Sequence, residues 1–351
     1  MKIFRVHTSA VMVVGLTACA LASEPRSDED VFSAVTSGLQ DSSNKKVRIA
    51  WLGNDPGNTY DNAIRDGASA LAATNNSTVT PFYANYNAAH QLSQCNMAAN
   101  SGSYGAIMII ANDGTGIIPC VIVARNHAVP VVAVDLPIGA DPTTAEPQVN
   151  GQVGAVLIPA AIWGSSLTSL VISLCASHTP CNVAYLAGAL TIPFDAIALQ
   201  DLDAAALSHP NLHIVARAEA FYDRATATLA TQSILAQHPD LHVLIGAGDQ
   251  MAAGGEDAIV AAGLPTGSIA IVGAGAGAYG ITAVQAGRWY GTFVALPYDE
   301  GTLGADIAIR AAREQPVADP GIDPVERAGL PRFYTRDNQG QFGNFTPQWP
   351  G

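Results

Sequence analysis

The stretch Lys46-Val-Arg-Ile-Ala-Trp-Leu-Gly53, continued by Asn54-Asp-Pro-Gly-Asn-Thr-Tyr-Asp61, contains the unit from which the rest of the chain is built. Its apolar run predicts a buried strand, its glycine and proline predict a turn, and the residues after Asp61 have the apolar pattern of a helix. The same order recurs along the chain. Short strands that alternate with helices indicate βαβ units, and the sequence therefore predicts an α/β protein built on parallel sheets.

The elements predicted from this pattern extend from residue 47 to residue 295. The strands are Val47–Leu52, Val79–Tyr83, Ala106–Ile110, Val131–Val134, Val183–Leu186, His213–Ala218, His242–Ile245, Ile269–Val272 and Thr292–Ala295. The helices are Asp61–Ala73, Ala88–Asn100, Thr115–His127, Ala155–Leu174, Ala196–Ser208, Arg224–Gln237, Gln250–Ala262 and Ile281–Ala286. A segment rich in Pro, Gly, Asp and Thr, residues 137–152, interrupts the series, and we place the first crossing between two domains there.

The first 22 residues have the pattern of an export signal, because Lys2 and Arg5 precede a short apolar run that is followed by small residues. The sequence Leu16-Thr-Ala-Cys19 resembles the lipobox of bacterial lipoproteins, in which the cysteine is lipidated. Cleavage after Ala20-Leu-Ala22 by ordinary signal peptidase is the alternative. Residues 23–45 are polar and acidic without an apolar period, which predicts a flexible tether.

The remaining cysteines fall into two pairs, Cys95 with Cys120 and Cys175 with Cys181. Each pair can form a disulfide, which agrees with an exported protein. A structural zinc site is the weaker reading, because neither pair has the close spacing of zinc ligands. The composition is acidic, with 16 lysine and arginine residues against 29 aspartate and glutamate residues. Such a surface argues against nucleic acids and against anionic membranes as partners.

No catalytic motif is present: the sequence lacks a nucleophile elbow, a Walker phosphate loop and an H-E-x-x-H zinc motif. We therefore expect no enzyme and no cofactor. Gly275-Ala-Gly-Ala-Tyr-Gly280 follows a strand and precedes a helix, as a dinucleotide motif does. The favoured alternative is that these glycines leave room for a ligand at the carboxyl ends of the strands. The histidine pairs His209/His213 and His238/His242 have metal-ligand spacing, but the proline in each indicates a turn.

Several segments in a shared order resemble the periplasmic sugar-binding proteins of the ribose-binding type, the soluble components of ABC importers. These segments are Asn58–Tyr60, Arg65–Gly67, Ala88–Gln94, Val129–Asp135, Gln237–Leu241, Asp249–Met251, Val272–Gly273, Thr335–Asn338 and Phe345–Trp349. The resemblance implies a type I periplasmic binding protein, with two similar Rossmann-like lobes joined by a three-segment hinge. We assign residues 46–148 and 297–328 to the N-terminal lobe, and residues 149–296 and 329–351 to the C-terminal lobe.

The resemblance also implies a small-molecule ligand in the cleft and a membrane permease as partner of a monomeric periplasmic protein, held to the membrane only by a lipid anchor. A ligand-sensing subunit of a receptor or kinase system is the alternative. Polar or aromatic residues at strand ends are expected at the ligand, with glycines that leave space. They are Asn54, Asp55, Asn58, Tyr60, Asp61, Asp113, Asp135, Asn150, Phe194, Tyr222, Gly248 and Gly275.

Departures from the family pattern bear on the ligand. Leu136 stands where an arginine usually follows the carboxylate, and the second-lobe arginine position falls near Ala198. Family amide, carboxylate and glutamine positions are Gly248, Gly275 and Ala295. A pyranose would leave hydroxyls unpaired there, at about 1 to 3 kcal/mol each. We therefore expect a ligand bulkier or less polar than a simple monosaccharide, held mainly by the first lobe and by stacking; a monosaccharide is the alternative.

Overall fold

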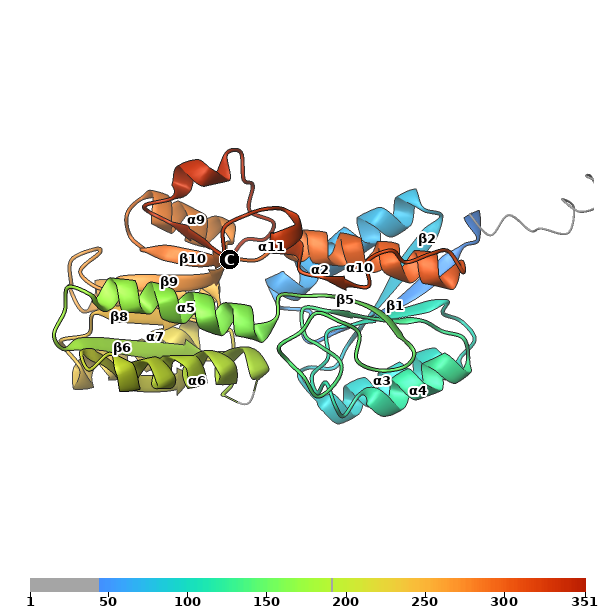
Figure 1. Ribbon diagram of the computed structural model, residues 1–351, viewed down its shortest axis with the longest axis horizontal. Coiled ribbons are helices and arrows are strands. Elements are labelled where there is room, and N and C mark those ends of the chain that lie inside the picture. Colours follow the sequence, from blue (N-terminus) through green and yellow to red (C-terminus); the bar gives the residue numbers. More distant parts are fainter. Residues whose placement is uncertain (1–43, 191) are drawn as a thin grey trace, which may run out of the picture. The chain divides into compact units, whose positions relative to one another are not determined.

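Two six-stranded sheets organise residues 44–190 and 192–351, which the computed structural model describes (Figure 1). The first has the order β11-β5-β4-β3-β1-β2 and the second β12-β10-β9-β8-β6-β7. Neighbouring strands pair in parallel except β10 and β12, which are antiparallel. Two parallel-sheet lobes of an α/β protein were expected, and this fold class is confirmed. The signal, Cys19 and the tether up to residue 43 lie outside the described residues.

The elements have the following bounds. The strands are β1 Val47–Gly53, β2 Ser77–Tyr83, β3 Ala106–Ile109, β4 Val131–Val134, β5 Gln152–Val156, β6 Cys181–Ala187, β7 Leu212–Glu219, β8 Val243–Gly246, β9 Ala270–Gly275, β10 Gly291–Val294, β11 Gly321–Ile322 and β12 Phe333–Thr335. The helices are α2 Thr59–Thr74, α3 Ala88–Asn100, α4 Ile118–Asn126, α5 Ala160–Cys175, α6 Pro193–Ser208, α7 Arg224–Gln237, α8 Asp249–Ala261, α9 Ala278–Gln285, α10 Pro297–Ala312 and α11 Pro324–Arg327, with the 3₁₀ turn η2 Gln339–Phe342.

The first sheet is covered on both faces. Ala50 and Leu52 of β1 pack in one apolar cluster with α3 and α4, while Ile49 and Trp51 pack in another with α2 and α10. Side chains of a strand alternate between the faces, so both sets of β1 residues are buried. In the second lobe α5 packs beside α6 and α7 beside α8. Figure 1 shows α5 and α6 in front of that sheet and α7 behind it.

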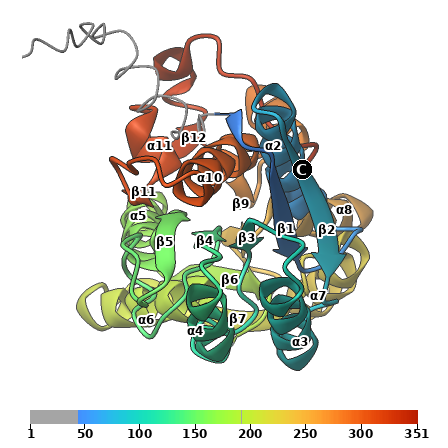
Figure 2. The same cartoon turned by 90° about the vertical axis from the view of Figure 1, so that its right-hand side faces the viewer.

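Helix α10 returns to the first lobe after β10 of the second sheet, and it packs against α2 (Figure 2). The two helices cross where Gly67 and Gly301 lie. A Cβ atom at Gly67 would overlap the carbonyl of Tyr298, and one at Gly301 would overlap the carbonyl of Ile64. The glycines thus allow the two backbones to approach closely. The elements predicted from the sequence end at residue 295, so this helix was missed.

Strand β5 follows the segment 137–152, in which the first crossing is expected. Its residues pair with β4, so this strand is part of the first sheet. The predicted helix 155–174 included the last residues of β5. The apolar run continues from β5 into α5, and its periodicity does not separate the strand from the helix.

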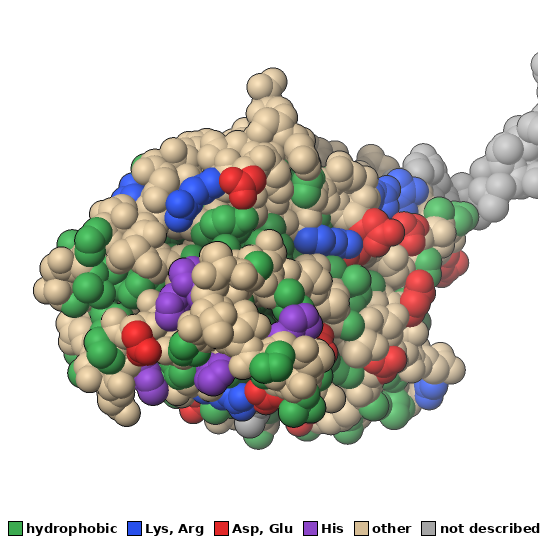
Figure 3. Space-filling model, turned by 60° about the vertical axis from the view of Figure 1, so that its left-hand side comes forward, with side chains coloured by type: hydrophobic (Ala, Val, Ile, Leu, Met, Phe, Trp, Pro, Cys, Tyr) green, Lys and Arg blue, Asp and Glu red, His purple; other side chains and the backbone are tan. Residues whose placement is uncertain are grey.

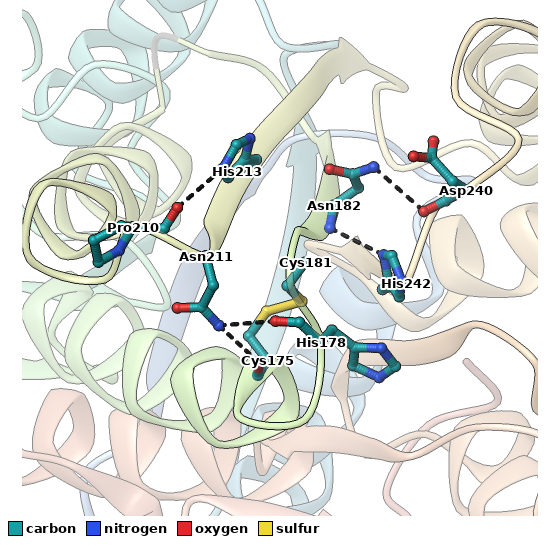
Figure 4. Close-up of a disulfide and its surroundings, with 9 residues drawn as sticks. All are labelled: Cys175, His178, Cys181, Asn182, Pro210, Asn211, His213, Asp240 and His242. Atoms are coloured by element: carbon teal, nitrogen blue, oxygen red, sulfur yellow. Dashed lines mark hydrogen bonds between the residues drawn. A yellow bond between two sulfur atoms is a disulfide. The ribbon is translucent and has the colours of Figure 1, made fainter.

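Both cysteine pairs form disulfides. Cys95 on α3 is bonded to Cys120 on α4, the helices that cover one face of the first sheet. Cys175 at the end of α5 is bonded to Cys181 at the start of β6 (Figure 4). The Asn211 side chain donates hydrogen bonds to the carbonyls of Cys175 and His178, at 2.8 and 3.1 Å, and so holds the loop that this disulfide closes.

Histidine side chains gather on one face of the second lobe (Figure 3). His209 and His238 follow the ends of α6 and α7, and His213 and His242 lie at the starts of β7 and β8. The backbone N–H of Asn182 donates to Nδ1 of His242. These positions support the interpretation of the pairs His209/His213 and His238/His242 as parts of helix-to-strand turns. Among residues 44–190 and 192–351, no group of three or more His, Cys, Asp or Glu side chains is placed to hold a metal ion. Within the same residues no helix has the length and apolarity needed to cross a bilayer.

Candidate functional site

A cavity of about 140 Å³ is lined by residues from both lobes, most of them in the segments that follow the parallel strands. The carboxyl ends of parallel strands are where open α/β sheets bind ligands. The two walls of the cavity differ in chemistry. The first lobe contributes most of the polar side chains, and the second contributes mainly apolar and aromatic ones.

The turn between β1 and α2 supplies one side of the polar wall. The Asn58 side chain caps α2 by accepting from the N–H groups of Tyr60 and Asp61, at 2.9 and 3.3 Å. Asp61, in the first helical turn, accepts from the backbone N–H of Asn54 at 3.0 Å and is buried. Capping is thus done by Asn58, and the Asp61 carboxyl lines the cavity instead. The buried Asn54 Oδ1 has no hydrogen-bond partner.

Two further carboxyl groups complete this wall. Asp135 follows β4 with a φ of 61°, a left-handed conformation that few residues other than glycine adopt. Glu300, in the first turn of α10, is 1% exposed. Its Oε1 accepts from the Tyr60 hydroxyl at 3.2 Å, while its Oε2 has no partner. Strand β4, helix α2 and helix α10 thus each direct a carboxyl group to the same cavity.

Burial changes the acidity of these groups. It raises the pKa of Asp61 to about 7, with a further contribution from the negative charge of Asp135. It raises the pKa of Asp135 to about 6. Burial and the neighbouring Asp135 hold the pKa of Glu300 well above its usual range. A low-dielectric surrounding disfavours the charged form of each carboxyl group.

The loop after β3 contributes an amide. The fully buried Gln91 side chain donates to the carbonyl of Ile110 at 2.8 Å and accepts from the backbone N–H of Asn112 at 2.9 Å. This fixes Asn112 at the cavity, where its Nδ2 has no partner. Tyr86, after β2, lies opposite and accepts from Asn58 Nδ2 at 3.1 Å.

The second-lobe wall rests on aromatic packing. Phe194, in the first turn of α6, stacks on Trp163 with 4.8 Å between ring centroids, and Phe293 meets the same tryptophan edge-on. Tyr222 follows β7 with a φ of 54°, and its ring lies over Gly188, where a Cβ atom would overlap it. Gln250 brings a polar side chain to this wall, and its Oε1 is without a partner.

Trp349 fills the space beside the glycine motif. Gly275 has a φ of 121°, and a Cβ atom there would overlap the Trp349 ring. The Trp349 indole N–H donates to the Gly275 carbonyl at 2.8 Å, and its ring meets Tyr60 edge-on at 5.3 Å. Gly275 lines the cavity, but the room that its missing side chain leaves is taken by a tryptophan, which corrects the expectation of space for a ligand.

The dinucleotide interpretation of the same motif is wrong. The N–H groups of Ala278 and Tyr279, at the start of α9, donate to the carbonyls of Trp349 and Pro350. The Gly277 N–H donates to the Asp249 carboxylate at 2.6 Å. The backbone groups that would bind a pyrophosphate are therefore already paired. Asp249 also accepts from the Thr292 hydroxyl, so it joins loop and strand rather than capping α8.

A family model described as "Periplasmic binding protein domain" matches residues 49–316. The chain belongs to this family of periplasmic binding proteins. The resemblance indicated by the sequence segments is thereby confirmed. Among curated proteins the search found no match.

Solved structures of periplasmic binding proteins show the same fold. The solute-binding protein of Actinobacillus succinogenes with bound D-allose has a TM-score of 0.71 at 21% identity, over 84% of this chain and 99% of that chain. The Bacillus halodurans protein with bound myo-inositol has a TM-score of 0.73 at 17% identity, over 86% and 99%. A Mycobacterium smegmatis protein with bound glycerol has a TM-score of 0.73 at 18% identity, over 87% and 99%.

Most residues that the sequence singled out lie at the cavity of this periplasmic binding protein. Those that line it are Asn54, Asn58, Tyr60, Asp61, Asp135, Phe194, Tyr222, Gly248 and Gly275. Asp55 accepts from the Gly57 N–H instead, and Asp113 accepts from the Thr115 and Gly116 N–H groups. Asn150 is exposed in the turn before β5. These three side chains lie in turns and are not among the residues that line the cavity.

Sequence reasoning missed several lining residues of this periplasmic binding protein, among them Tyr86, Asn112, Gln250, Glu300 and Trp349. For Glu300 a signal was available. Pro297 with Asp299 and Glu300 directly after a strand is the start pattern of a helix, with proline and acidic residues in the first turn. For Trp349 no local pattern predicts that the tail packs against Gly275.

Proposed function

We propose that this periplasmic binding protein captures one small molecule between its two lobes and delivers it to the permease of an ABC importer. The observation that carries this proposal is the cavity itself, at the carboxyl ends of both sheets, with unpaired polar atoms of Asn54, Asn112, Gln250 and Glu300 at its wall. Unpaired buried polar atoms cost free energy, and a ligand that pairs with them recovers it. The three similar structures described above have D-allose, myo-inositol and glycerol bound.

The ligand that we propose is less polar than a monosaccharide. Its polar groups meet the first lobe, and its apolar side lies against Phe194, Tyr222 and Phe293. A pyranose presents hydroxyls on all sides and would leave those on the second-lobe side unpaired. The volume does not support the expectation of a bulkier ligand. A cavity of about 140 Å³ is close to the roughly 150 Å³ that holds one benzene molecule in an engineered protein.

The proposal includes a monomer that is exported and anchored by a lipid on Cys19. The two disulfides support an oxidising compartment, and the segment Leu16–Cys19 supports the anchor. The lobes of this proposal comprise residues 46–156 with 297–328, and residues 157–296 with 329–351. All strands of the first sheet lie in the first set of residues and all strands of the second sheet lie in the second set, which supports this division. The three connecting segments would act as the hinge.

Native mass spectrometry tests capture. The purified protein is incubated with a small-molecule extract of bacterial cells, and the mass of any retained compound is measured. We expect one compound per chain, lost in Asp135→Ala and in Tyr60→Ala. The matched control is Asp113→Ala, which removes another carboxylate that follows a strand but does not line the cavity. Retention that is unchanged in both cavity variants would refute the proposed site, and retention of a pentose or hexose would refute the proposed ligand class.

A further inference from the structure

The cavity wall carries three carboxyl groups without an opposing positive charge. Asp61, Asp135 and Glu300 line it, and none of the arginine or lysine residues in the described ranges 44–190 and 192–351 does. Arginines of this part of the chain pair elsewhere, for example Arg224 with Asp257 and Arg288 with Glu256. A buried carboxylate is stable only with a partner that compensates its charge or occupies its lone pairs.

Among the fully buried atoms of the lining side chains, the unpaired ones are mostly acceptors. Glu300 Oε2, Asn54 Oδ1 and Gln250 Oε1 lack a donor, and Glu300 and Asn54 are 1% and 5% exposed. Asn112 Nδ2 is the one unpaired donor among these fully buried atoms. A hydroxyl both donates and accepts, whereas an ammonium group donates only. A wall with this excess of acceptors matches a ligand that brings donors.

Aromatic rings are the second feature of the cavity that suits a cation. Tyr60 and Trp349, which meet edge-on, line the cavity together with Phe194, Tyr222 and Phe293. The faces of such rings attract organic cations. A metal ion would need several acidic or imidazole ligands close together, and the described residues contain no such group of three. The chemistry thus favours an organic cation over a bare metal ion.

We propose that the ligand is a compact organic cation, an ammonium group on a small apolar body, held by Asp61, Asp135 and Glu300. This inference rests on the proposed capture function and names the class of its ligand. The ammonium group donates to the carboxylates and to Asn54, and the apolar body lies against the second-lobe rings. Charge-assisted hydrogen bonds of this kind are roughly twice as strong as neutral ones.

Isothermal titration calorimetry with matched pairs of probes tests this inference. Cyclohexylammonium is compared with cyclohexanol, and benzylammonium with benzyl alcohol, while myo-inositol and D-allose serve as neutral polyols. We expect each cation to bind the full chain at least about tenfold more tightly than its neutral partner. Glu300→Gln and Asp135→Asn should remove this preference, whereas Asp113→Asn, outside the cavity, should keep it. Circular dichroism of each variant shows that it is folded.

The retained compound from the mass-spectrometric capture gives a second readout. A retained compound that is a cation at neutral pH supports the inference even if the four ring probes do not bind. A neutral or anionic compound that is retained, or neutral probes that bind as tightly as the cations, overturns the inference and leaves the capture function standing. If neither the probes nor any compound of the extract binds, both the capture function and the inference fail.

Discussion

The Asp135 carboxyl group, which has no compensating positive charge, makes the stability of the protein without ligand depend on pH. Its pKa of about 6 lies above the ordinary value of about 4. Between these two values the folded chain holds a proton that the unfolded chain has released. The contribution of Asp135 to stability is therefore complete below about pH 4 and is lost as the pH rises through about 6. Asp61 and Glu300, which share the cavity, change stability in the same direction.

Replacing Asp135 by asparagine should stabilise the empty protein above neutral pH. We expect Asp135→Asn to raise the free energy of unfolding at about pH 8 by about 1 to 3 kcal/mol, with little change at about pH 4. Urea denaturation of both proteins at the two pH values measures this. Asp61 and Glu300 stay in place and continue to titrate.

Asp113→Asn is the control for this measurement. Hydrogen bonds from Gly116 and Thr115 lower the pKa of Asp113, so its charged form stabilises the fold. That stability is present above the ordinary pKa and is lost as the pH falls, and the substitution should therefore not stabilise at high pH. A destabilised Asp135→Asn at about pH 8 would contradict the description of Asp135 as a buried carboxyl group without a compensating positive charge.

The candidate site could be predicted from the sequence where it follows a strand. Asn54 and Asp135 come directly after a strand, Tyr60 and Tyr222 follow a strand within a few residues, and parallel strands bring their carboxyl ends to one edge. Asp113 follows the same rule and yet turns back to cap its own loop, because its carboxylate is within reach of the next N–H groups. The rule locates the loop but does not fix the direction of a side chain.

At the level of elements, the C-terminal tail forms part of the cavity wall. Trp349 packs against Gly275 and Tyr60, and Gln348 is hydrogen-bonded to Asp299 at the start of α10. Residues 348–349 thus contact the second sheet and two helices of the first lobe.

A methyl group at Gly275 should disrupt this packing. We expect Gly275→Ala to lower the free energy of unfolding by at least about 2 kcal/mol, because the positive φ is strained for alanine and the Trp349 ring must move. Gly263→Ala is the matched control, since Gly263 also has a positive φ but open space around it. It should cost only about 1 kcal/mol. Equal losses in urea denaturation would contradict the role of Trp349.

The sequence predicted most central strands well, but it did not predict the elements after residue 295. Strands β1, β4 and β6 are buried apolar runs between turns, which is a local signal. Strands β11 and β12 have two and three residues, too few for a period. Helix α10 contains Gly301 and Gly304, which weaken the helical signal and are explained only by contacts with other elements.

For the whole molecule, a ligand shifts the arrangement of the lobes only if it binds one arrangement better than another. The first lobe supplies the carboxylates and the second supplies the rings, so a bound ligand gains contacts from both when the lobes approach. We infer that binding draws the lobes together, and that a permease would recognise the result.

Spin labels measure this approach directly. Cysteines introduced for labelling at the exposed positions Ser93 on α3 and Leu207 on α6 report the distance between lobes. We expect the distance to shorten when the captured ligand is added. Labels at Leu207 and Leu229, both in the second lobe, are the control and should show no change. An unchanged distance in the first pair, with ligand bound, would exclude a role for lobe closure.

The return of α10 to the first lobe determines the order in which the chain can fold. Until residue 312 has been synthesised, the face of the first sheet beside α2 lacks its second helix, and apolar side chains such as Met108 and Val134 stay partly uncovered. The first lobe therefore cannot mature while the second is still being made. A fragment ending before Pro297 should be prone to aggregation, whereas a circular permutant that begins at α10 would restore this helix early and should fold sooner.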